Sequence, residues 1–136
     1  MGMLGGGCAW ADLGECALLV GDTAAARGFF EKGLSVRTPH MFLQKPRFLG
    51  GLASAALLEG NPEGALRWAE QARAWIEERQ MAWLRPAIEL TRAQVQSALS
   101  HPAAARECYQ AAAAGAMAMG MRPLFLCARR GEQELS

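Results

Sequence analysis

One short corner sequence recurs three times along this chain and constrains its fold more than any other feature. It reads Gly60-Asn61-Pro62 in the middle, with Gly21-Asp22-Thr23 upstream and Ser100-His101-Pro102 downstream, so that the three corners are almost evenly spaced. Glycine suits the position that ends a helix in a left-handed turn, Asn or Asp caps the next helix, and proline fits its first turn. The corners therefore predict three helix–turn–helix units.

The composition favours helices throughout. About half of the residues are hydrophobic (51%), but only one is tyrosine, and the scarcity of β-branched and aromatic residues disfavours sheet. We therefore expect an all-α protein.

Charge and apolar patterning exclude several classes of partner. The 14 basic and 13 acidic residues leave a net charge of +1, too little to attract nucleic acid or an anionic membrane surface. No apolar run reaches the length of a membrane span, and the first residues do not resemble a secretory signal. The four cysteines lack CxxC spacing and are typical of reduced thiols. A cytoplasmic protein is expected.

The helical periodicity predicts a single domain over residues 1–136. After a flexible start at 1–7, three helix pairs are expected at about 8–37, 40–79 and 82–119, followed by a capping helix at about 122–135. In the first helix, Trp10, Leu13 and Ala17 mark the predicted buried stripe. Pro46 and Pro86 hold equivalent positions in the second and third units, and each either begins its helix or kinks it.

From Trp10 onward the chain resembles the tetratricopeptide repeat, whose signature is W-x2-L-G-x2-Y, then G, then A-x3-F-x2-A, then P. The first repeat matches it at Trp10, Leu13, Gly14, Ala17, Gly21, Ala26, Phe30, Gly33 and Pro39. The second matches at Leu49, Leu52, Ala53, Ala56, Gly60, Ala65, Ala69 and Ala72. The third begins weakly, with Glu89, Arg92, Ala93 and Gln96 at the first motif positions, and then follows the pattern at Ser100, Ala105, Tyr109 and Ala112. The resemblance implies a right-handed α-solenoid of three repeats plus the capping helix.

The family resemblance also implies how the helices pack. The small residues Gly14, Ala53 and Ala93 would let the two helices of a pair approach closely, while Phe30 and Tyr109 would fill the space between pairs. The long period is similar to that of C-terminal arrays in large bacterial regulators, such as LuxR-type ATP-binding activators and cyclase-like multidomain proteins. No phosphate-binding GxxxxGK[ST] loop accompanies it here.

Members of this family bind a peptide or a helix in a concave groove along their first helices. The groove positions predicted here are Ala11, Glu15, Leu18, Gly50, Ser54, Leu57, Leu90, Gln94 and Ser97. Ala11 and Glu15 stand where a chaperone-tail clamp needs a cation and an amide, so an acidic tail is disfavoured. A neutral, partly apolar groove favours a partner helix or an apolar peptide. In the alternative interpretation, Leu18 and Leu57 pack between repeats.

No constellation typical of catalysis, of a metal site or of a cofactor site stands out. His40 and His101 lie far apart, and His101 occupies the cap position held by Asn61 in the preceding unit. Met117, Met119 and Met121 alternate and favour gap filling at a helix end over a soft-metal site. We therefore expect a non-enzymatic protein without cofactor or metal.

Two further residue sets carry competing interpretations. Lys45, Arg85 and Arg122 each precede a proline; they form either a basic ladder for an acidic partner or, as we favour, cations near the ends of preceding helices. Cys108 and Cys127 lie on helices expected to be neighbours, and we expect buried free thiols.

The sequence thus predicts a scaffold or adaptor module that binds another protein. The alternative is a homodimer formed through the N-terminal end of the solenoid, because the chain ends in the polar residues GEQELS but begins with apolar and glycine residues.

Overall fold

A computed structural model describes residues 7–35 and 41–135 of the chain, with side chains described from 10 to 35 and from 44 to 135. Residues 1–6 of the predicted flexible start, Pro39, His40 and the side chain of Cys8 lie outside these residues. Within them the structure contains helices and no strand, which confirms the all-α prediction.

Seven α-helices and one short 3₁₀ turn make up the described residues. They are α1 (Gly7–Leu19), α2 (Thr23–Ser35), α3 (Met41–Leu58), α4 (Pro62–Glu78), the 3₁₀ turn η2 (Ala82–Leu84), α5 (Arg85–Ala98), α6 (Pro102–Ala118) and α7 (Arg122–Glu134). None of the described helices has the length and apolarity needed to cross a membrane.

Five helices end in the same hydrogen-bonded turn. In each, one residue adopts a left-handed conformation with φ between 55° and 80°, namely Gly21, Gly60, Gln80, Ser100 and Gly120. The next residue donates its N–H to the carbonyl oxygen five residues back, at 2.8–2.9 Å, which satisfies a carbonyl that the helix end leaves free. The last four turns follow one another at equal intervals along the chain. The sequence analysis did not identify the turn at Gln80.

The caps of the following helices agree only in part with the prediction. Asn61 Oδ1 accepts a hydrogen bond from the Gly64 N–H at 3.0 Å, and Asp22 Oδ1 accepts one from Ala25 N–H at 3.1 Å, as expected for caps. His101 holds the cap position of α6, but its side chain caps no N–H. Its Nδ1 lies 2.9 Å from Gln96 Oε1 instead.

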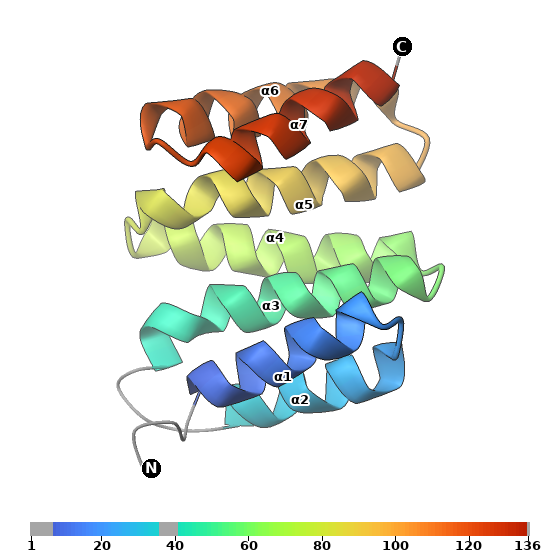
Figure 1. The fold of residues 1–136 in the computed structure, drawn as a ribbon, viewed down its shortest axis with the longest axis vertical. Helices are drawn as coiled ribbons and strands as arrows, with labels where there is room; N and C mark the ends of the chain where they lie inside the picture. The colour runs from blue at the N-terminus through green and yellow to red at the C-terminus, as the bar shows by residue number, and fades with distance from the viewer. Residues whose placement is uncertain (1–6, 36–40, 136) are drawn as a thin grey trace.

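The helices stack in chain order from α1 and α2 at one end to α6 and α7 at the other (Figure 1). Each helix packs against the next one in the chain. The odd-numbered helices also contact one another, since α1 packs on α3, α3 on α5 and α5 on α7. The odd-numbered helices therefore share one layer, and the even-numbered helices lie behind it.

Aromatic rings pack against glycines at the helix junctions. Phe30 of α2 is fully buried, and a Cβ atom added at Gly14 of α1 or at Gly51 of α3 would lie 2.3–2.4 Å from its ring. Tyr109 of α6 is buried as well, and a Cβ at Gly131 of α7 would lie 2.3 Å from it. The predicted packing roles of Gly14, Phe30 and Tyr109 are therefore confirmed.

Two local expectations need correction. The first helix of the pair predicted at about 82–119 does not begin at residue 82, because the 3₁₀ turn at 82–84 precedes α5. Pro86 is the second residue of α5, whereas Pro46 lies inside α3, which begins at Met41. Leu13 does not share the buried stripe of Trp10 and Ala17, because its side chain is 44% exposed.

Candidate interaction surface

The layer of odd-numbered helices contains a concave region, called here the central hollow, with a volume of about 520 Å³. Helix α3 forms its floor, α1 one wall, and α5 with the preceding 3₁₀ turn the other. Its lining residues are Glu15, Leu18, Gln44, Pro46, Arg47, Gly50, Gly51, Ser54, Ile76, Trp83, Leu84, Ala87, Ile88 and Thr91.

The small residues of α3 make the centre of this hollow deep. Gly50, Gly51 and Ser54 lie along its floor, where larger side chains would fill the space. Gly51 has no room for a side chain, since Phe30 packs against its other side. The packing of α2 against α3 therefore depends on Gly51, whereas a Cβ atom added at Gly50 would lie 3.9 Å from Ile88 on the opposite wall of the hollow.

An apolar wall faces this floor. Trp83 is 51% exposed and lies in the 3₁₀ turn, next to Leu84 and one helical turn from Ala87 and Ile88. A half-exposed tryptophan beside a concave apolar surface is typical of residues that anchor a partner, since it offers a large contact area at a small entropic cost.

A charged cluster borders the central hollow at α1. Arg47 Nε and Nη2 donate to the two carboxylate oxygens of Glu15, each at 2.8 Å, and Nη2 also lies 2.7 Å from Asp12 Oδ1. The hydrogen bond to Glu15 is the main contribution that raises the pKa of Arg47 above its usual value. Two carboxylates against one guanidinium leave this rim with a net negative charge.

The predicted groove residues separate into three groups. Glu15, Leu18, Gly50 and Ser54 line the central hollow. Gln94 and Ser97 are exposed on α5 but lie outside its lining.

The remaining three predicted residues are covered by neighbouring helices. Ala11 is fully buried and offers no surface to a partner. Leu57 packs against the cluster that joins α3, α4 and α5, as the alternative interpretation expected. Leu90 packs against the buried residues of α6.

Sequence reasoning missed Gln44, Arg47 and Trp83. Gln44 Oε1 on α3 is buried in the lining of the central hollow without a hydrogen-bond partner. Arg47 and Trp83 each lie within three residues of one of the equivalent prolines. The available sequence signal for Trp83 was a tryptophan three residues before a proline.

The three cations that precede prolines are held in different ways. Lys45 Nζ lies 4.1 Å from the centre of the Trp75 ring, and Arg85 Nη2 lies 4.0 Å from a carboxylate oxygen of Glu77 in the last turns of α4. Arg122 lines a separate hollow at the α6–α7 corner.

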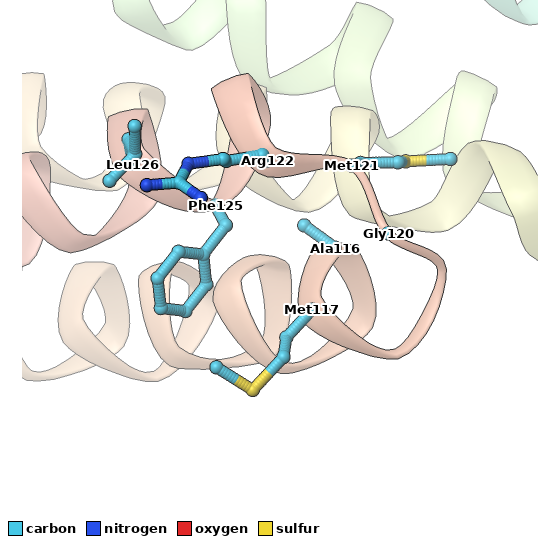
Figure 2. Close-up of a pocket in the computed structure, with 7 residues that line it drawn as sticks. All are labelled: Ala116, Met117, Gly120, Met121, Arg122, Phe125 and Leu126. Carbon is cyan, nitrogen blue, oxygen red and sulfur yellow. The ribbon is translucent and has the colours of Figure 1, made fainter.

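The α6–α7 corner encloses a smaller apolar hollow of about 410 Å³. Figure 2 shows the Phe125 ring directed from α7 toward α6, with the Met117 side chain on the same side, while Met121 extends in another direction. Met119 is exposed and does not line this hollow. Among described residues, no three His, Cys, Asp or Glu side chains cluster closely enough to hold a metal ion.

The described cysteines differ in their burial. Cys108 is buried between α5 and α6, and this burial is the main reason why the pKa of its thiol is raised. Cys16 and Cys127 are free and exposed. The expectation of a buried thiol is therefore correct for Cys108 and wrong for Cys127.

Comparison of this chain with protein-family models, with curated proteins and with solved structures finds no match.

Proposed function

We propose that this chain is a non-catalytic protein-interaction module that binds a peptide or helix of another protein in the central hollow. In this proposal the helix pairs form a right-handed solenoid of three tetratricopeptide-like repeats, and α7 closes its C-terminal end. The contact of α1 with α3, of α3 with α5 and of α5 with α7 supports this arrangement, because neighbouring first helices line the concave face of such arrays.

The observation that carries the proposal is the half-exposed Trp83 opposite the small floor residues of α3. The wall formed by Trp83, Leu84 and Ile88 suits an apolar side chain of the partner. The acidic rim at Asp12 and Glu15 suits a basic residue next to that apolar side chain, since opposite charges across an interface favour association.

A pull-down from a lysate of the source organism tests the proposal. It uses four baits, namely the wild-type chain and three variants. Ser54→Arg fills the central hollow with a long charged side chain, while Ala111→Arg makes a comparable change at an exposed position of α6, in the other layer. We expect one protein to be retained by wild type and by Ala111→Arg, and to be lost with Ser54→Arg and with Trp83→Ala. Equal retention by all four baits would exclude the central hollow as the binding site.

Binding to a synthetic segment of the retained protein then checks the chemistry. Replacing its basic residue by glutamine should weaken binding to wild type but not to Glu15→Gln. If the replacement weakens binding to wild type and to Glu15→Gln equally, the acidic rim does not contribute to binding.

A further inference from the structure

The hollow at the α6–α7 corner combines an apolar surface with a cation. Met117 of α6 is 65% exposed and Leu126 of α7 is 54% exposed, and both line the hollow together with Met121 and Phe125. Arg122, the first residue of α7, adds the cation to this lining, and its side chain extends along α7 toward Leu126 (Figure 2). The volume of about 410 Å³ lies within the range of small-molecule sites, roughly 300–1,000 Å³.

The α4–α5 corner, one repeat earlier, shows how this chain partners such a cation. Arg85 begins α5 there as Arg122 begins α7, and each is followed by a proline. Arg85 Nη2 lies 4.0 Å from Oε1 of Glu77. Three residues before the left-handed residue that ends its helix, α4 has Glu77, whereas α6 has Met117 at the same position. The α6–α7 corner therefore has the arginine but not its carboxylate.

The connection into α7 also leaves space beside this arginine. In the α4–α5 corner the 3₁₀ turn Ala82–Leu84 precedes Arg85, and Leu84 packs against the core that contains residues of α4 and α5. In the α6–α7 corner Arg122 follows Met121 directly, and no such turn precedes α7. The α6–α7 hollow therefore lacks both the filling turn and the carboxylate that the α4–α5 corner contains.

Two cations flank the apolar surface of this hollow. Arg129 lies one helical turn beyond Phe125, on the same face of α7, with its Cζ 5.9 Å from the centre of the ring. Within the described part of the chain, neither Arg122 nor Arg129 forms an ion pair with a carboxylate. A surface that is apolar at its centre and positively charged at its edge is complementary to an anion with an apolar body.

We propose that the α6–α7 hollow binds a small carboxylate with an aliphatic body. The carboxylate pairs with Arg122, as Glu77 pairs with Arg85 in the preceding corner, because a guanidinium matches the geometry of a carboxylate with two parallel hydrogen bonds. The aliphatic body lies against the Phe125 ring and the Met117 side chain, and the flexible methionine adapts to its shape. This site does not depend on the function proposed for the central hollow.

NMR of methionine methyl groups, with octanoate as the probe, tests the proposal on the full chain. Octanoate should shift the methyl signals of Met117 and Met121, which line the hollow, and leave the signal of the buried Met81 unchanged. Ser54→Arg, which fills the central hollow, should bind octanoate as wild type does. Unchanged Met117 and Met121 signals at ~10 mM octanoate overturn the proposal, because even weak small ligands bind at this concentration.

Two variants and a neutral analogue test the role of the charge. Arg122→Gln should weaken octanoate binding about tenfold, the usual loss when a hydrogen bond between charged groups is removed. Arg130→Gln, at an exposed cation of α7 that is paired with Glu134, should bind octanoate as wild type does. 1-Octanol should bind wild type about tenfold more weakly than octanoate does, and should bind Arg122→Gln and wild type equally. Octanol binding as tight as that of octanoate, or full octanoate affinity in Arg122→Gln, overturns the assignment of an anionic ligand.

Discussion

The α2–α3 junction and the α4–α5 junction occupy equivalent places in consecutive repeats, yet they are packed by different means. In the first, the ring of Phe30 fits between glycines of α1 and α3. In the second, Ala69 takes the position of Phe30, and Thr91 takes the position of Gly51. There Arg92, whose side chain is 16% exposed, hydrogen-bonds to Glu70 across the junction and to Glu89 on its own helix.

The difference shows that ring and glycine occur together. Gly51 faces Phe30, and Gly131, at the same position two repeats later, faces Tyr109. Between them, Thr91 is opposite an alanine, and no glycine is needed. The helix can approach a ring closely only where it has no Cβ, so the side chain of one helix determines which residue the next helix can carry.

The polar α4–α5 junction requires that its buried charges stay paired. Burial lowers the pKa of Arg92, but its hydrogen bonds to Glu89 and Glu70 outweigh this effect and raise the pKa above its usual value. Glu89 is the buried charged residue of the described core. A buried carboxylate is tolerated only while its cation remains.

Removing the aromatic ring of Phe30 should have the largest effect on the free energy of unfolding. Phe30→Ala should lower the free energy of unfolding by about 3–5 kcal/mol, the usual cost of emptying a well-packed aromatic site. Urea denaturation measures this value. Tyr109→Ala should behave similarly, and a loss below about 1 kcal/mol would contradict the ring's central role.

Removing the buried cation should come next. Arg92→Met should cost about 2 kcal/mol, because Glu89 is left without its partner in a site that water reaches only in part. Arg73→Met, which breaks exposed pairs on α4, should cost no more than about 0.5 kcal/mol. Equal losses for the two variants, measured by urea denaturation, would show that the junction does not depend on the ion pair.

The glycine opposite the ring should be less costly to change. Gly51→Ala should lose about 1–2 kcal/mol through overpacking against Phe30. Thr91→Ala at the equivalent position should be neutral or slightly stabilising, because alanine has the higher helix propensity. In a Phe30→Leu background the loss from Gly51→Ala should shrink, and a double-mutant cycle measures this coupling.

The helix corners give the smallest expected effect. Gln80→Gly should stabilise the protein by about 1 kcal/mol, because a left-handed conformation strains a residue with a Cβ. Gly60→Ala, at a position with open space around it, should lose a similar amount for the same reason. Thermal denaturation measures the change in stability of both variants. If the two changes have the same sign, strain in the left-handed conformation is not their cause.

Much of the local structure follows from the sequence. Gly60 and Asn61 end one helix and cap the next, because each backbone preference acts within a few residues. The corner at Gln80 escaped prediction because glutamine carries no turn signal, and the hydrogen bonds of the helix end impose the left-handed conformation there. Pro46 and Pro86 also look alike in sequence, although only Pro86 lies at the start of its helix.

The candidate site was predictable only in part. Glu15, Leu18 and Ser54 lie on the surface that the repeat pattern assigned to them. Ala11 and Leu90 hold positions equivalent to Gly50 of the hollow's floor, but neighbouring helices cover them. Arg47 was missed because its role arises from Asp12 and Glu15 on another helix, and Trp83 because only the tertiary structure places it in the lining of the hollow.

By itself, the sequence determined the helices and all of their corners except the one at Gln80, since these depend on hydrogen bonds and backbone preferences within about one helical turn. Only the tertiary structure decided which faces remain open. Leu13 and Leu52 occupy the same repeat position, but one is half-exposed and the other buried, because burial depends on whether another helix lies against that face.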